Sequence, residues 1–310
     1  MLLSEAIEQI LACPVCKGAL VLENAGGQIA CLYCQSSFPV QNDIPIFIDP
    51  ANIIQKSERL FRDNLAVKHI DFGKCDLLAI AGKHHCIPVM KFYADCFRSR
   101  LAPHEWLLDV GIGYGWHWSK SSVSRGSVIG VDISLGNLQL AQKVLDAENN
   151  VLLVCADASR LPIRDNVISA IWSVQTIQHF PDTVFDRFLV EMNRILKQDF
   201  RIEYHNLHPS ALSRGIYGLF RKNFHRSGST GTMELQRLSE SEWLNKWKSF
   251  HQRKVKTKVR YSELFFHPDF HIKPDPYPVW VERFMAEHLP AAASFIARQN
   301  VLCIESSFNS

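Results

Sequence analysis

The sequence contains no long run of apolar residues and no strong excess of charge of either sign. No hydrophobic stretch approaches the roughly 20 residues that cross a membrane, and the formal net charge is only +3 over 310 residues. The first residues contain no basic region followed by an apolar core. We therefore expect no secretory signal, no membrane partner and a cytoplasmic location. So small a charge does not by itself indicate nucleic-acid binding.

Nine cysteines in such a chain favour thiols and metal ligands over disulfides. Four of them form two pairs, Cys13-Pro-Val-Cys16 and Cys31-Leu-Tyr-Cys34, separated by fourteen residues. Two such pairs offer four soft ligands (Cys13, Cys16, Cys31 and Cys34), which suit a structural tetrahedral Zn²⁺ and leave no open position for catalysis. We predict a zinc ribbon over residues 1–50, with a hairpin formed by Ala19–Glu23 and Gln28–Cys31. So short a module buries little core, so the metal should supply most of its folding free energy.

A glycine-rich turn follows a buried-strand pattern near the middle of the chain. Trp106–Val110 is apolar except for Asp109, as expected of a strand inside a parallel sheet. The turn that follows carries glycine at alternate positions, Gly111, Gly113 and Gly115. Glycine lacks a Cβ, so backbone there can turn sharply and a ligand can come close. The dinucleotide fingerprint also needs glycine at the sixth position, which is Trp116 here, so that pattern fails.

Three further apolar runs with polar ends follow in order. They are Ser127–Val131 before Asp132, Val151–Cys155 before Asp157, and Asn166–Trp172 before Gln175. Asp132 lies roughly 20 residues beyond the glycines, where an acid can accept hydrogen bonds from ribose hydroxyls. From roughly Phe92 to Ser306, the ordered runs resemble the class I S-adenosylmethionine (SAM)-dependent methyltransferases. The resemblance implies an α/β, doubly wound, mostly parallel, Rossmann-like sheet of seven strands and a SAM-dependent methyltransferase activity.

The same resemblance implies roles for individual residues. Asp109 would sit near the methionine amino group of SAM, Asp132 would hold the ribose, and Gln175 would lie beside the methionyl end. Asp157 and the amide of Ala158 would hold the adenine. The implied cofactor-binding residues are Asp109, Gly111, Gly113, Gly115, Asp132, Ile133, Asp157, Ala158 and Gln175.

The N-terminal module resembles the small zinc-ribbon family that activates RNA and protein methyltransferases as a separate subunit. The matching residues are Leu11–Gly18, Leu20, the second cysteine pair and the tail Phe38–Phe47. Bacterial rRNA guanine methyltransferases also carry an N-terminal zinc ribbon, but their tail matches less well. The resemblance implies that the activator is fused in cis, so we expect no separate zinc-ribbon partner.

The acceptor side gives weaker signals. Methyl transfer from a sulfonium is an in-line displacement, so the protein mainly aligns the reactants, and a base is needed only when the acceptor loses a proton. The catalytic residue stays unassigned, with His179, Tyr204 and His205 as candidates and His208 close by. A packed, hydrogen-bonded core histidine is the favoured alternative for His179.

Three functions stay open. A small metabolite or natural-product intermediate is the first acceptor class, because the methyltransferase half most resembles the small-molecule group. RNA is the alternative, because Lys254–Arg260 alternates and places four basic residues on one strand face. That face would equally protect an edge strand from pairing. A non-catalytic SAM-binding or zinc-ribbon adaptor protein is the third, since Lys197-Gln-Asp-Phe200 replaces the Lys-Pro-Gly-Gly turn usual in the family.

The remaining pattern predicts the domain layout. Residues 51–100 form a helical linker and pocket cover, and residues 101–310 form the methyltransferase domain with an insertion near 207–240. The expected helices are Ser57–Val67, Val89–Leu101, Ser134–Leu145 with Ser134 as N-cap, Asp182–Leu196 capped by Asp182, and Ser239–Phe250. The expected late strands are Phe200–Asn206 and Asn300–Glu305, and Arg226–Thr232 is expected to be an irregular loop. His84-His85-Cys86 suggests either a second metal site or, more simply, the polar start of a helix.

Overall fold

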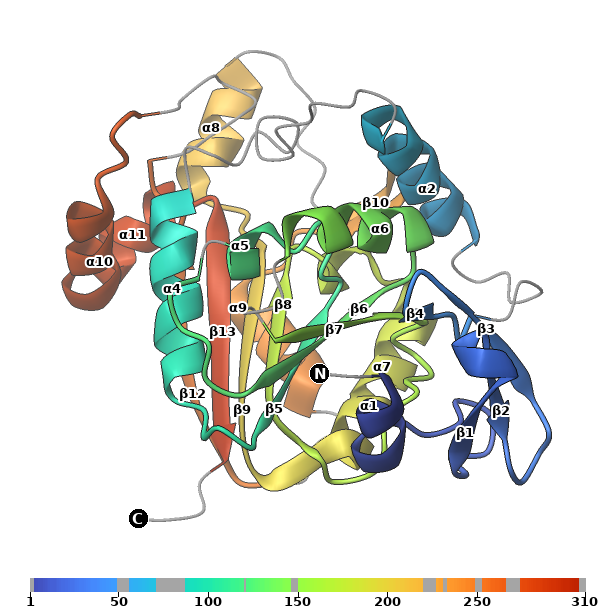
Figure 1. Ribbon diagram of the computed structural model, residues 1–310. Coiled ribbons are helices and arrows are strands. Elements are labelled where there is room, and N and C mark those ends of the chain that lie inside the picture. Colours follow the sequence, from blue (N-terminus) through green and yellow to red (C-terminus); the bar gives the residue numbers. More distant parts are fainter. Residues whose placement is uncertain are drawn as a thin grey trace.

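A seven-stranded sheet forms the centre of the protein (Figure 1). The computed structural model describes residues 3–48, 56–70, 87–119, 121–145, 150–219, 227–230, 233–248, 253–265 and 274–306. The sheet order is β12-β13-β9-β8-β5-β6-β7, and β13 alone runs against the others. The strands are β5 Trp106–Val110, β6 Ser127–Asp132, β7 Val151–Cys155, β8 Ile168–Val174, β9 Leu196–Leu207, β12 Val255–Ser262 and β13 Gln299–Ser306. This is the predicted doubly wound class I methyltransferase sheet.

Helices cover both faces of this sheet, which is why its central strands are apolar on both sides. One face packs against α4 Ile87–Ser99, α5 Trp116–Ser119 and α6 Leu135–Val144. The other packs against α1 Leu3–Gln9, α7 Asp182–Ile195 and α9 Glu240–Lys248. Further helices are α2 Lys56–Ile70, which packs against α6, and α8 Ala211–Leu219, α10 Val279–His288 and α11 Pro290–Ile296. In the part of the chain that the structure describes, no helix has the length and apolarity to cross a membrane.

The N-terminal module is a small antiparallel sheet in the order β1-β2-β3-β4. Its strands are β1 Leu20–Glu23, β2 Gln28–Cys31, β3 Ser37–Gln41 and β4 Ile44–Pro45, with a 3₁₀ turn η1 Asn24–Gly26 between the first two. The predicted hairpin is confirmed. In Figure 1 this module lies at the β7 edge of the central sheet.

Most predicted elements are confirmed, including α6 with Ser134 as N-cap, whose hydroxyl accepts a hydrogen bond from Asn137 N. Asp182 does not cap α7, because Pro181 occupies the N-cap position and the Asp182 carboxylate bonds Lys246 instead. The unusual Lys197–Phe200 segment forms no separate turn. β9 begins directly after α7, and the strand bulges between the pairs Ile168↔Leu196 and Ala170↔Arg201.

The insertion also differs from the prediction. Residues 227–230 form strand β10, Ser227–Thr230, which pairs with β11, Met233–Gln236.

A short 3₁₀ turn, η4 Ile177–His179, follows β8. The suggested His84-His85-Cys86 group lies outside the described residues.

Candidate functional site

The glycine turn after β5 is folded back onto the end of β6. Gly111 N and Ile112 N both donate to Val131 O, at 2.7 and 3.1 Å. Gly111 has a φ of +74°, and an added Cβ would meet the Thr176 side chain at 2.1 Å, so only glycine fits there. Gly113 has a φ of +55°, yet no described atom lies within 4 Å of where its Cβ would be. The backbone at Gly113 therefore borders open space, whereas Gly115 packs against Leu145.

Asp132 closes this turn from the end of β6. Its Oδ2 accepts a hydrogen bond from Gly113 N and its Oδ1 accepts one from Ser134 N, both at 2.9 Å. Burial raises the pKa of Asp132, and these backbone hydrogen bonds oppose that rise. The next residue, Ile133, is half-buried, and its carbonyl lies 3.8 Å from Cys155 Sγ. The carboxylate thus lies against the turn, directly beside the open side of Gly113.

Asp109 is fully buried at the end of β5. Its Oδ2 accepts a hydrogen bond from Trp118 Nε1 and lies 2.7 Å from His117 Nε2. Its Oδ1 has no hydrogen-bond partner among the described residues. Buried polar atoms are almost always hydrogen-bonded in folded proteins, so this oxygen indicates a place where a ligand or water supplies a donor.

The other predicted cofactor residues lie at neighbouring strand ends. Asp157 and the buried Ala158 follow β7, and Asp157 Oδ1 accepts a hydrogen bond from Ser159 N at 2.8 Å. Gln175 follows β8 with a φ of +53°, and its N–H donates to His205 O at 2.7 Å. Because β8, β5, β6 and β7 are adjacent parallel strands, the predicted residues share the carboxyl edge of the sheet, where ligands of such sheets bind.

The acceptor-side candidates Tyr204, His208, His179 and His205 lie in different surroundings. Tyr204 points into the core beneath α7, with its ring 6.2 Å from Phe188. His208 is 3.1 Å from Ser294 O and packs on Tyr261, and half-buried His179 lies beside Gln178. His205 lies on the opposite face from Tyr204, fully buried against Trp172 at 4.4 Å between ring centroids.

The four predicted metal ligands meet at one point of the N-terminal module. Cys13 and Cys34 Sγ are 3.6 Å apart, Cys16 and Cys31 Sγ are 3.4 Å apart, and all four sulfurs lie within 4.8 Å of one another. Four thiolates at about 2.3 Å from a tetrahedral zinc would be spaced about 3.8 Å apart. The donor set and its spacing therefore fit zinc.

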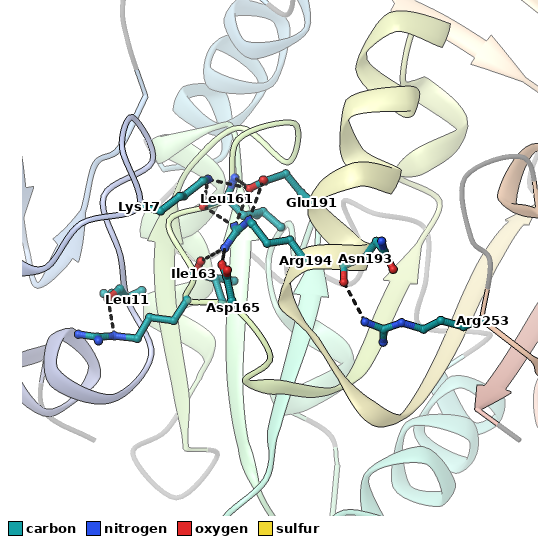
Figure 2. Close-up of polar contacts among 10 residues, drawn as sticks. Leu11, Lys17, Leu161, Ile163, Asp165, Glu191, Asn193, Arg194 and Arg253 are labelled. Atoms are coloured by element: carbon teal, nitrogen blue, oxygen red, sulfur yellow. Dashed lines mark hydrogen bonds and ion pairs between the residues drawn. The ribbon is translucent and has the colours of Figure 1, made fainter. Parts of the chain in front are cut away.

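Polar contacts join the ribbon to the methyltransferase domain (Figure 2). Lys17 Nζ donates to Leu161 O at 3.0 Å and lies 2.9 Å from Glu191 Oε2 on α7. Arg164 of the larger domain in turn donates hydrogen bonds to Leu11 O and Ile7 O of the N-terminal module, both at 3.1 Å. These side chains connect the two modules in both directions.

Glu191 is the centre of this interface. Its Oε2 also accepts hydrogen bonds from Leu161 N at 2.7 Å and from Arg194 Nη2 at 2.8 Å. Burial opposes its ionisation, but the hydrogen bonds from Arg194 and Lys17 outweigh it and hold the pKa of Glu191 below its usual value. The segment that carries Asp157 and Ala158 leads directly into Leu161, so the ribbon holds the end of that segment.

The ribbon also covers the exposed edge of the central sheet. Phe47 N donates to Cys155 O at 2.8 Å, and Ile46 forms a parallel bridge to Cys155 at the end of β7. Apolar ribbon residues such as Leu20, Ile29 and Phe38 belong to the same core as α7. An uncovered edge strand would expose unpaired backbone N–H and C=O groups. Here the ribbon pairs with the end of β7.

Family comparisons agree with this two-part structure. Residues 108–201 match the model of the methyltransferase domain, and residues 9–43 match that of the Trm112p-like proteins. A UPF0434 protein of Nitrosococcus oceani is 39% identical over 41 residues, which are 13% of this chain and 70% of the relative. A malonyl-[acyl-carrier protein] O-methyltransferase of Gallionella capsiferriformans is 31% identical over 114 residues, 34% of this chain. The chain spans only 39% of the length of that methyltransferase.

Solved structures show the same fold at low sequence identity. The complex between the Haloferax volcanii Trm112 methyltransferase activator and a methyltransferase matches with a TM-score of 0.51 and 15% identity, covering 81% of this chain and 98% of that one. Geranyl diphosphate C-methyltransferase from Streptomyces coelicolor matches with a TM-score of 0.50 and 15% identity, covering 84% and 100%. Residues 108–201 thus form a methyltransferase domain, and the chain belongs to the UPF0434 family through its Trm112p-like residues 9–43.

Proposed function

We propose that the protein transfers a methyl group from SAM, bound at the turn after β5, to a small-molecule acceptor. The observation that carries the proposal is the open space beside Gly113, whose N–H is held by the Asp132 carboxylate at the end of the adjacent strand β6. A Cβ at Gly113 would project into this space without meeting any atom of the described residues within 4 Å. Backbone that must lie close to a ligand requires such a position.

The residues around this space suit the parts of SAM. The unpaired Oδ1 of Asp109 can accept a hydrogen bond from the methionyl ammonium. Asp132 Oδ2 keeps a further lone pair for a ribose hydroxyl besides the bond it accepts from Gly113 N, whereas Oδ1 accepts from both Ser134 N and Asn137 Nδ2. Asp157 and the Ala158 amide would hold the adenine, and Gln175 would lie near the methionyl end. When bound, SAM supplies a methyl group on a good leaving group, so the protein's task is alignment.

In the ribbon we propose a structural Zn²⁺ held by the four cysteines. Four protein ligands leave no position for substrate, and two of them, Cys13 and Cys31, belong to the apolar core shared with α7, whereas Cys16 and Cys34 are exposed. The fused ribbon would then do in cis what a separate activator subunit does elsewhere. We therefore propose that the protein needs no additional zinc-ribbon partner.

A small-molecule acceptor agrees best with the relatives. Those that match the methyltransferase half include the malonyl-[acyl-carrier protein] O-methyltransferase and a demethylmenaquinone methyltransferase of Staphylococcus aureus, 36% identical over 94 residues. The RNA alternative loses part of its basis, because Arg260 pairs with Glu203 and faces α4. Lys254, directly before β12, and Lys256 and Lys258 on this edge strand remain exposed, and lysines there also discourage unwanted strand pairing.

A labelling experiment distinguishes the three candidate functions. Zinc-loaded protein would be incubated with methyl-tritiated SAM and with the RNA or small-molecule fraction of a bacterial extract. We expect label in the small-molecule fraction. Label in RNA that is lost when Lys254, Lys256 and Lys258 are changed to glutamine would support the RNA alternative. Binding of S-adenosylhomocysteine (SAH) without turnover in either fraction would favour a non-catalytic protein.

A further inference from the structure

His205 is a fully buried histidine on β9, and neither ring nitrogen has a hydrogen-bond partner among the described residues. Nε2 lies 3.5 Å from Glu203 Oε2, whereas Nδ1 has no charged group at such a distance among them. The ring packs on Trp172 at a tilt of 47°, and its centre lies 6.3 Å from that of the Tyr93 ring. A packed core histidine normally satisfies both nitrogens, as His208 does more nearly with Ser294 and Asn300.

Glu203 and Arg260 hold the Nε2 side of this ring. Arg260 Nη2 donates to Glu203 Oε2 at 2.6 Å, and its guanidinium lies 4.5 Å from the centre of the Tyr93 ring. Burial opposes ionisation of Glu203, but Arg260 outweighs it and keeps the pKa of Glu203 low. The negative carboxylate 3.5 Å from Nε2 favours the tautomer with its proton on Nε2, which leaves a lone pair on Nδ1.

The charged groups around His205 leave it neutral. Burial lowers the pKa of His205, and Glu203 offsets this only in part. The other groups that face it are Arg260 from β12, Tyr93 from α4 and the more distant Glu263. A neutral imidazole with an aligned carboxylate behind it can take up a proton.

Its position is next to the proposed methyl donor. Trp172 on β8 is in register with Asp109 on β5 and with Glu203 on β9. The His205 carbonyl accepts from Gln175 N, and Gln175 is the residue proposed beside the methionyl end. Tyr93 Oη and Trp172 Nε1 are also buried without partners among the described residues. Polar atoms without partners thus line one aromatic region beyond Asp109.

We propose that His205 is the general base of the reaction, that Glu203 and Arg260 position it, and that the acceptor is a neutral hydroxyl on a planar, apolar body. This proposal rests on the proposed function. The acceptor hydroxyl gives its proton to His205 Nδ1 while its oxygen bonds the methyl carbon. The carbon–sulfur bond breaks, and its electron pair stays on sulfur. The imidazolium is stabilised by Glu203 and later loses the proton to solvent.

The surroundings explain this acceptor class. Trp172 and Tyr93 pack beside His205, and Phe97 packs on Trp172, so the surroundings of the imidazole are aromatic and suit an aromatic body. Arg260 is already paired with Glu203, so its charge is not free to balance an anionic acceptor such as a carboxylate or diphosphate. A phenol, whose pKa of about 10 resembles that of tyrosine, is neutral at pH 7 and within reach of an imidazole base.

The test uses zinc-loaded full-length protein with ¹⁵N-labelled histidines and bound SAH. Phenol is the probe, anisole is the matched probe without a proton, and benzoate is the anionic one. We expect His205 as the neutral Nε2–H form at pH 7, and a shift of its Nδ1 resonance with phenol but not with anisole or benzoate. A charged His205, the Nδ1–H form, or equal responses to phenol and anisole would overturn the proposal.

Variants separate this inference from the proposed function. His205→Gln, with His208→Gln as the matched control, assigns the resonance, and through-bond spectra assign it if the variant does not fold. Glu203→Gln should abolish the preference for the Nε2–H form while SAH affinity changes less than twofold; an unchanged preference would remove Glu203 from the positioning role. Failure of the wild type to bind SAH would defeat the proposed function. If the wild type binds SAH but the Nδ1 resonance of His205 does not respond to phenol, only this inference is defeated.

Discussion

Lys17, the residue directly after the proposed metal ligand Cys16, lies 2.9 Å from Glu191 on α7 of the methyltransferase domain. Lys17 has a φ of +62°, and Gln35 has a φ of +60° at the equivalent position after Cys34. The turn that shapes the metal site thus also aims the lysine at the other domain. Burial lowers the pKa of Lys17, and the hydrogen bond to Glu191 opposes that change. The contact joins metal binding to the domain interface.

Replacing this lysine should weaken the whole protein. Lys17→Met keeps the aliphatic chain but removes the donor from Leu161 O and Glu191, so we expect the free energy of unfolding to fall by about 1–2 kcal/mol. The control is Lys246→Met, whose partner Asp182 is exposed, with an expected loss below about 1 kcal/mol. Urea unfolding of zinc-loaded protein measures both. Equal losses in the two variants would contradict a special role for Lys17.

Loss of the metal should spread beyond the ribbon. Cys31 is buried and belongs to the same apolar cluster as α7. Cys31→Ser should therefore release zinc and lower the unfolding temperature of the whole chain in one transition. Cys96→Ser, at an exposed cysteine outside the cluster, should change neither zinc content nor stability. Calorimetry showing a separate ribbon transition, with normal SAH binding, would make the ribbon an independent arm.

Glu282 should make stability depend on pH. Burial raises its pKa to about 7, and Tyr277 and the backbone of Leu264 donate to it. Since its folded pKa exceeds the unfolded value, its stabilising contribution is complete below about pH 4.3 and disappears as pH rises through 7. Relative to Glu282→Gln, the wild type should gain about 2 kcal/mol between pH 8 and pH 5. Denaturant unfolding at both values checks this, and a parallel pH dependence would contradict it.

Much of the fold could be predicted because the signals are local. Buried parallel strands read as apolar runs, and the polar residues at their ends mark the carboxyl edge of the sheet. The cysteine spacing likewise predicted the cluster that the structure brings together. The Asp182 cap was wrong because the preceding Pro181 takes that position. The Lys197–Phe200 departure is absorbed by a bulge in β9, a pairing detail that one strand's sequence does not encode.

Contacts between distant segments could not be predicted from one sequence. The sequence around Lys17 does not indicate that Glu191 is its partner. Strict alternation placed Arg260 on one exposed face with three lysines, but in the structure Arg260 lies over the Tyr93 ring of α4. The alternation in Arg201-Ile-Glu-Tyr-His205 could have separated His205 from Tyr204, because neighbouring strand residues face opposite sides. Its pairing with Glu203 and Trp172 needed the three-dimensional structure.

The most direct test of the central claim is calorimetry of SAH binding to zinc-loaded wild type, Gly113→Ala and Gly215→Ala. Each substitution adds one methyl group where no described atom lies within 4 Å. The one at Gly113, whose φ is +55°, also strains the backbone, and it alone enters the proposed cofactor space. The wild type and Gly215→Ala should bind SAH with equal affinity, and Gly113→Ala at least tenfold more weakly, a difference of about 1.4 kcal/mol. Absence of binding to the wild type, or equal affinity in all three proteins, would contradict the account.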